Sequence, residues 1–255
     1  MKKVRTYKLS ALFIYILLPV LILIAWKLSD IIGLIQPYAM PTIESVLQVT
    51  WEYSKDLSLF NNIFISFVRV VEGFVIASVL ALVLGIGIGL SKNLEIFTEL
   101  IIQVLKPIPP IAWIPLAILW FGIGEFSKVF IISLGAFFPI LINVVDGIKE
   151  IDNKYLEVSK IYEVPRLKVI KKVIIPGAFP SIMTGLRVGL GNAWVCVVAA
   201  EMIAATQGVG YMLMDGRSLS RPEIVILAML IIGIVGKLMD DLIKKLSEKL
   251  IKWRV

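Results

Sequence analysis

The stretch Glu157–Pro176 reads EVSKIYEVPRLKVIKKVIIP and separates two long apolar segments of the chain. Its composition favours helix, and we expect Asp152 to cap a first short helix. Pro165 should end that helix, and Pro176 should break a second one where the chain re-enters the apolar phase. A structured, charged insert of this kind is typical of a membrane protein that docks a cytosolic partner. The alternative is an interfacial helix that rests on anionic headgroups.

The composition indicates a membrane protein, because 58% of the 255 residues are hydrophobic and the mean hydropathy is +0.91. Soluble domains are about 45–50% apolar. Apolar runs near 18 residues recur, which is about the length that crosses a bilayer core as a helix. We therefore predict an all-α polytopic membrane protein with about six spans in a single domain, 1–255. The expected spans are Leu9–Trp26, Gly73–Leu90, Pro107–Gly124, Val129–Val145, Pro176–Ala200 and Ile224–Met239.

The distribution of Lys and Arg predicts the orientation. Basic residues are dense before the first span, between Lys149 and Lys172, and from Lys244 to Arg254, and they are sparse in the alternate loops. The positive-inside rule then places both termini in the cytoplasm of a multi-pass plasma-membrane protein. The net charge of +7 is accounted for by this topology, and its scatter argues against a nucleic-acid surface. We expect the first segment to be a retained span, since no small-x-small cleavage site follows it.

Several kinds of chemistry have no support in the sequence. The chain has no histidine and one cysteine, Cys196, which lies inside an expected span, so neither a metal cluster nor a disulfide framework is predicted. The GIGIG string at Gly85–Gly89 follows no strand and lacks the Lys-Ser/Thr of a nucleotide loop. We expect no catalytic residue and no cofactor. The small-xxx-small pairs Gly85/Gly89 and Gly185/Gly189 instead predict close helix packing.

The third span carries the prolines Pro107, Pro109 and Pro110. Each removes a backbone donor, and the carbonyl groups that this frees must be satisfied by protein or by water in a cavity. We therefore predict that this segment lines the interior of a bundle, where a solute pathway would lie. The alternative is a static, kinked helix.

Three polar residues in the fifth span are further pathway candidates. Arg187 lies inside the span, where a guanidinium must face protein or water, and it suits either an anion contact or a structural ion pair, which we favour. Glu201 is expected at the outer end, as a possible gate or external contact. Asn192, like Asn143, is expected to bridge helices rather than to contact solute. Two helical ion pairs are also predicted, Arg69 with Glu72 and Lys237 with Asp240.

The residues around the charged insert resemble a known family. Glu157-Val158-Ser159, followed by Val173, Ile175 and Pro176, is similar to the EAA loop of ABC importer permeases, whose pattern is EAA, three residues, Gly, nine residues and Ile-x-Leu-Pro. The family's Gly falls on Glu163, which puts the local turn geometry in question. The segments PIPPIAWIPLAILWFGIGEFSK (Pro107–Lys128) and LRVGLGNAW (Leu186–Trp194) resemble the nitrate, sulfonate and taurine branch, and the likeness covers roughly residues 60 to 254.

The resemblance implies a type I importer permease fold with a core over 60–250 and a cytoplasmic coupling loop over 152–176. It also implies that a small, anionic solute crosses between two such subunits, as a homodimer. Two copies of a cytosolic ATPase would bind the loops, and an extracytoplasmic solute-binding protein would deliver the solute. The residues implied to couple to the ATPase are Glu157, Ser159, Tyr162, Glu163, Val173 and Pro176.

Two alternatives remain open from the sequence. The same branch serves vitamin-type solutes such as riboflavin or a thiamine precursor, so the residues do not fix the solute. A self-contained secondary transporter would need intramembrane carboxylates or histidine and inverted repeats. The carboxylates Glu72, Glu201 and Asp240 lie near span ends, and we find no internal repeat. The chain also lacks a P-loop, so it is not expected to be an enzyme that hydrolyses ATP.

Overall fold

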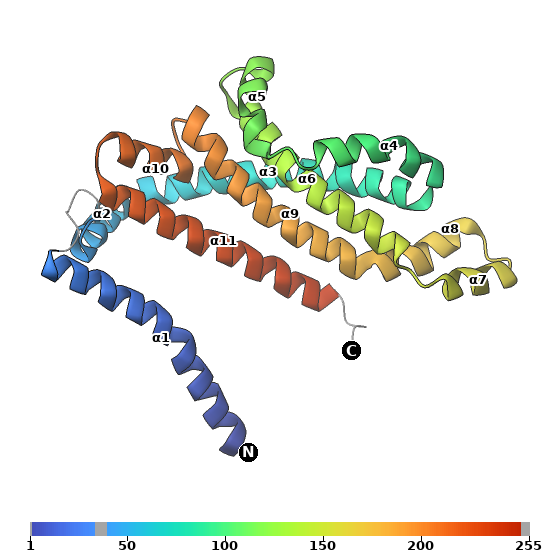
Figure 1. Cartoon of the computed structure of the whole chain (residues 1–255), viewed down its shortest axis with the longest axis horizontal. Coiled ribbons are helices and arrows are strands. Elements are labelled where there is room, and N and C mark those ends of the chain that lie inside the picture. Colours follow the sequence, from blue (N-terminus) through green and yellow to red (C-terminus); the bar gives the residue numbers. More distant parts are fainter. Residues whose placement is uncertain (1, 34–39, 251–255) are drawn as a thin grey trace. The chain divides into compact units, whose positions relative to one another are not determined.

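The computed structural model describes residues 2–33 and 40–250, without the side chains of 2–15, Asn153 and Leu156. The described residues form helices and turns only, which confirms the predicted all-α class. Lys252 and Arg254, which contributed to the predicted orientation, lie outside the described residues. Figure 1 labels the helices, and the elements are, in chain order, α1 (Lys2–Ile32), α2 (Ile43–Lys55), α3 (Ser58–Leu90), α4 (Lys92–Leu105), the 3-10 turn η1 (Pro110–Trp113), α5 (Ile114–Phe121), α6 (Glu125–Lys149), α7 (Asn153–Ile161), α8 (Arg166–Val169), the π turn η2 (Ile170–Ile174), α9 (Ile175–Ala204), α10 (Val209–Ser218) and α11 (Pro222–Leu250).

The helices long enough to span a membrane confirm most of the predicted topology. Four described segments qualify by length and hydropathy, Ser58–Leu90, Glu125–Lys149, Arg166–Ala204 and Pro222–Leu250. The segments Lys92–Leu105 and Pro110–Phe121 form a fifth span if the pair, bent by 86°, counts as one. The remaining expected span, Leu9–Trp26, falls on α1, where part of the side chains lies outside the described residues.

The chain divides into two compact units. The larger unit comprises residues 60–212 and 230–255, and it holds the helices that matter for function. Its most extensive contact runs between α6 and α9. Figure 1 shows α3, α6 and α9 running lengthwise beside one another in this unit.

Glycines allow α3 to approach α6 closely. A methyl group added at Gly85 would lie 2.8 Å from Cγ1 of Val144, and one at Gly89 would lie 2.9 Å from Cβ of Ile148. Contacts this short are incompatible with any side chain larger than hydrogen, because interiors are close-packed. The Gly85/Gly89 prediction of close packing is therefore confirmed, with α6 as the partner helix.

The other face of α6 receives α9 through the second predicted glycine pair. A methyl group at Gly185 would lie 2.7 Å from Cβ of Asn143, and one at Gly189 would lie 2.6 Å from Cγ1 of Ile140. The buried thiol of Cys196 lies against Gly135 of α6, as expected of a small apolar side chain. The glycines of α3 and α9 therefore allow both helices to pack closely against α6.

The inner part of α11 packs antiparallel to α9 in the same unit. Trp194 donates its indole N–H to the carbonyl oxygen of Ile232 over 2.9 Å, and its ring lies about 3.0 Å from the position of a methyl group on Gly236. The carbonyl of Ile232 thereby satisfies the polar end of a buried indole. Asp240, one turn further along α11, then comes level with Arg187 of α9.

The smaller unit comprises residues 1–59 and 213–229. The helix α2 follows the first segment, and Thr42 caps it, since Oγ1 of Thr42 accepts from the amide of Ser45 over 3.1 Å. The ammonium of Lys27 lies 2.6 Å from the carboxylate of Glu44, and Trp26 donates to the carbonyl of Pro41. These contacts fasten α2 to the end of α1.

Candidate functional site

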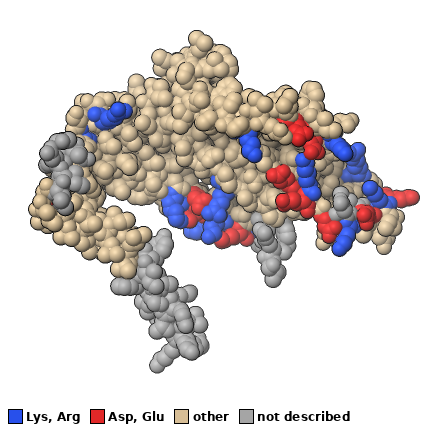
Figure 2. All heavy atoms as spheres, in the orientation of Figure 1, with Lys and Arg blue, Asp and Glu red and all other residues tan. Residues whose placement is uncertain are grey.

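The insert between α6 and α9 begins with the capped helix α7. Oδ1 of Asp152 accepts from the amide of Lys154 over 2.9 Å, which confirms the predicted N-cap. Glu157 is exposed on this helix, and Ser159 returns its hydroxyl to the carbonyl of Tyr155. Charged side chains gather around the α7–α8 end of the larger unit (Figure 2).

The outer face of α7 is apolar and uncovered within the described chain. Tyr155, Val158, Ile161 and Tyr162 are 52–77% exposed, and Leu167 on α8 is 74% exposed. Helical spacing places the first four side chains on one face of the helix. A cluster of exposed aromatic and aliphatic side chains this large marks a surface that binds another protein or the membrane interface.

The turn after α7 places Glu163 in the left-handed conformation, with φ of 48°. The amide of Glu163 bonds to the carbonyl of Lys160 and the amide of Val164 bonds to that of Ser159, both over 3.0 Å. These two bonds form a Schellman cap, which normally uses glycine at this position. The EAA pattern has its glycine here, so Glu163 keeps the expected backbone geometry at a cost in strain.

The return from α8 into α9 differs from the prediction. We expected Pro176 to break the helix, but α8, η2 and α9 continue as one span from Arg166 to Ala204. A π turn over Ile170–Ile174 precedes Pro176, which lies in the first turn of α9. Proline has no N–H to contribute there, and the wider turn accommodates the missing bond without a break. Val173 lies within this π turn and is half-buried.

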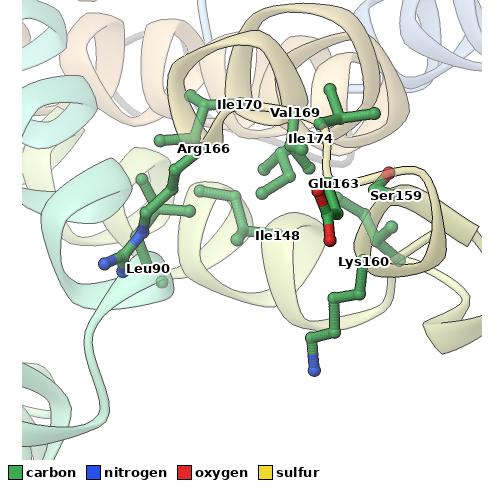
Figure 3. Close-up of a pocket in the computed structure, with 12 residues that line it drawn as sticks. Leu90, Ile148, Ser159, Lys160, Glu163, Arg166, Val169, Ile170 and Ile174 are labelled. Carbon is green, nitrogen blue, oxygen red and sulfur yellow. The ribbon is translucent and has the colours of Figure 1, made fainter. Parts of the chain in front are cut away.

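A cavity of about 460 Å³ separates the loop from the inner ends of α3 and α6. Figure 3 shows Leu90, Ile148, Ile170 and Ile174 converging on it, with Glu163 at the α7 side. The floor is apolar, and the polar groups of Ser159, Lys160, Glu163 and Arg166 lie at its edge. The cavity therefore separates part of the loop from α3 and α6, while Ile151 and Ile174 pack against the core of the larger unit.

At the opposite end of the larger unit, a buried ionic network centres on Arg69 of α3. Nη1 of Arg69 lies 2.8 Å from Oε1 of Glu201, while its Nε and Nη2 donate to both carboxylate oxygens of Glu125 over 2.6 and 2.7 Å. Lys128 donates to the same Glu125 carboxylate over 2.8 Å. The predicted pair of Arg69 with Glu72 is wrong, because partners on α6 and α9 occupy the guanidinium.

Glu201 is enclosed by protein, with a side-chain exposure of 0%. Its carboxylate accepts from the hydroxyl of Ser66 over 2.8 Å and from the amide of Gly210 over 2.9 Å. Gly208, at φ of 119°, leaves no room for a side chain, since a methyl group there would lie 2.4 Å from the carboxylate. In this conformation Glu201 ties the start of α10 to α3 and α9, and its role in a pathway stays a prediction.

The proline-rich third span is bent rather than gently kinked. α4 ends before Pro107, and Pro109 and Pro110 lead into η1. Pro107 and Pro109 are exposed and Pro110 is half-buried. The prolines remove backbone donors and so account for the 86° bend. Their place in a pathway remains a prediction.

Arg187 and Asp240 form a two-point ion pair between α9 and α11. Nε and Nη2 of Arg187 lie 2.5 and 2.7 Å from the two carboxylate oxygens of Asp240. The structural ion pair favoured for Arg187 is therefore confirmed. Lys237 bonds to Asp241, one helical turn away, while the Asp240 carboxylate bonds to Arg187.

Asn143 does not bridge helices as predicted, and the prediction for Asn192 stays a prediction. Asn143 donates to the carbonyl of Pro139 on its own helix over 2.8 Å. Asn192 is exposed on α9 and has no hydrogen-bond partner among residues 2–33 and 40–250. Ser66, Glu125 and Lys128 belong to the network around Arg69 and were not identified from the sequence. A search for oppositely charged residues at similar depths in different predicted spans could have found the charged members.

The comparisons with known proteins agree with this arrangement. The family model for the inner membrane component of binding-protein-dependent transport systems matches residues 77–252. The chain belongs to this family. A protein of Methanocaldococcus jannaschii that carries the name ABC transporter permease protein is 41% identical to this permease over 95% of the chain and 92% of the relative.

Two further relatives place the permease within one branch. The Bacillus subtilis protein named as the aliphatic sulfonates transport permease protein SsuC is 39% identical over 94% of this chain and 87% of its own. The taurine transport system permease protein TauC of Escherichia coli is 32% identical over 92% and 87%. An inward-facing structure of the MetNI methionine ABC transporter covers 78% of this chain and 97% of its own with a TM-score of 0.57 at 17% identity, which supports the type I importer fold. The permease is thus the membrane component of an ABC importer.

Proposed function

We propose that this permease forms, with a second copy of itself, the pathway for a small solute with an oxyanion head. The supporting observation is the Arg187–Asp240 pair, whose side chains are 43% and 40% exposed on the larger unit. Arg187 lies about 18 Å from the start of α9 and about 26 Å from its end at 1.5 Å per residue. Charged groups this deep face protein or water rather than lipid.

The exposed residues of α9 from Thr184 to Val195 form one stripe, which we call the open face of α9. Their spacing of three and four residues places them along one side of the helix. Its members are Thr184, Arg187, Val188, Gly191, Asn192 and Val195. Thr184, Arg187 and Asn192 make this stripe partly polar, which favours contact with water and a second protein surface over contact with lipid, and a second copy of the permease would supply that surface.

The exposed apolar face of α7 is the observation that favours the rest of the proposed assembly. We infer that two copies of a P-loop ATPase cover the apolar face of α7, one on each permease, and that an extracytoplasmic binding protein delivers the solute to the opposite end. This orientation puts α7 and both termini in the cytoplasm. Glu157, Ser159, Tyr162, Glu163, Val173 and Pro176 lie in or beside this surface, which is consistent with a role in coupling.

Uptake by proteoliposomes tests the solute class. The permease, together with the ATPase and binding protein that copurify with it, should import nitrate, taurine or ethanesulfonate in a saturable, ATP-dependent manner. Import of riboflavin without uptake of any oxyanion would contradict the proposal and support the vitamin-type alternative. Uptake that persists without the ATPase would instead indicate a secondary transporter.

A further inference from the structure

The guanidinium of Arg187 has two edges that bind an oxyanion with two parallel hydrogen bonds. Asp240 occupies the edge formed by Nε and Nη2. The Nη1 group carries two further N–H donors, and Nη1 makes no hydrogen bond to any of the described residues. The end-on edge of Nη1 and Nη2 is therefore free to bind a second carboxylate-like group.

The surroundings leave this edge accessible. The Arg187 side chain is 43% exposed even with Asp240 bound. Helical side chains extend toward the N-terminus of their helix, so the residue one turn later covers a given side chain. That residue is Gly191, and a methyl group on it would meet no atom within 4 Å. Gly191 therefore leaves open space on the same face of α9, one turn beyond Arg187.

We propose that the end-on edge of Arg187 is a transient binding site for the oxyanion head of the solute, and that Asp240 is the positioning residue that aims it. The inference rests on the proposed pathway along the open face of α9. A sulfonate, a nitrate or a carboxylate presents two oxygens at the spacing that the guanidinium fork matches. Asp240 also offsets the positive charge of Arg187, so the site binds an anion without retaining it.

Charge-selective labelling of a single cysteine tests this site in full-length permease in its native membrane. Cys196 is buried and is replaced by alanine, and Gly191→Cys then places one thiol beside Arg187. The reagents are an anionic and a cationic methanethiosulfonate of equal size. The ratio of the anionic to the cationic labelling rate, which we call the anionic preference, should fall on the order of tenfold in Arg187→Gln, because one positive charge beside the thiol is removed.

Protection by ethanesulfonate distinguishes two-point binding by the guanidinium from attraction by a positive charge alone. Sodium ethanesulfonate should slow labelling of Gly191→Cys relative to sodium chloride at the same ionic strength. Arg187→Lys should keep the preference for the anionic reagent and lose this protection, because an ammonium lacks the fork. Asp240→Asn should increase the preference, since a negative charge is removed, yet lose the protection, since the guanidinium is no longer aimed.

The possible failures have different meanings. Val195→Cys, one turn beyond Gly191 on the same stripe, serves as the control for water access. If neither thiol reacts with either reagent, the open face of α9 is not a water-lined pathway, and both proposals fail. If both thiols react but ethanesulfonate gives no protection, or protects Arg187→Lys equally well, the pathway stands and the Arg187 site is wrong.

Discussion

Nη1 of Arg69 and Oε1 of Glu201 lie 2.8 Å apart, although 132 positions separate them in the sequence. The same Nη1 also donates to the carbonyl of Gln207 over 2.7 Å, and Glu201 accepts from the amide of Gly210. One buried ion pair thus fixes both ends of the segment that leads from α9 into α10. Arg69 lies in α3 and Glu201 lies in α9. Any movement of these two helices against each other would therefore also move the segment between α9 and α10.

Glu201→Gln should destabilise the permease by about 1–3 kcal/mol, because an amide group cannot accept from all the donors that now face the carboxylate. Thermal unfolding in mild detergent measures the effect. Glu72→Gln is the matched control, since Glu72 is exposed on α3 beyond the network, and it should change stability by less than about 0.5 kcal/mol. Equal stability of the two variants would show that the network contributes little.

Gly85→Ala and Gly87→Ala test the glycine contact between α3 and α6. The first places a methyl group 2.8 Å from Val144 and should cost about 1–3 kcal/mol through overpacking. The second meets only Leu94 at 3.8 Å and should be neutral or stabilising by up to about 1 kcal/mol, since alanine favours helix. The two unfolding temperatures should therefore move apart. If both variants behave alike, close packing at Gly85 is refuted.

Glu163→Gly should stabilise the end of α7, because glycine adopts the left-handed conformation without the strain that a Cβ imposes there, about 1 kcal/mol. Hydrogen exchange of the α7 amides measures the effect and should slow. Glu163→Ala serves as the control, since it removes the carboxylate but keeps the Cβ, and should give no such slowing. Faster exchange in the glycine variant would mean that the Glu163 side chain itself holds the turn.

Local signals in the sequence were enough for the helices and their caps. Asp152 is a small polar residue directly before an amphipathic segment, and it caps that segment as predicted. The glycine pairs also identified packing faces, since a repeat of four places both glycines on one side of a helix. Each of these features depends on residues within one or two turns, so the linear sequence contains the whole signal.

The ion pairs could not be assigned in the same way. Arg69 has an acidic residue one turn away, Glu72, yet its partners come from α6 and α9. Asp240 has Lys237 one turn before it and pairs with Arg187 instead. A two-point bond between different helices is stronger than a single-turn pair on one helix, and the helix pairing that permits it is a tertiary property. The continuous helix through Pro176 was missed because a π turn has no clear sequence signature.

Copurification tests the central claim most directly. The tagged permease is extracted from its native membrane in mild detergent, and native mass spectrometry identifies what accompanies it. The account predicts two permease copies with two copies of a P-loop ATPase, and loss of the ATPase in Glu157→Lys on α7 but not in the matched variant Glu99→Lys on α4. Recovery of the permease without any ATPase, or equal ATPase binding by both variants, would contradict the assignment of α7 as the coupling surface.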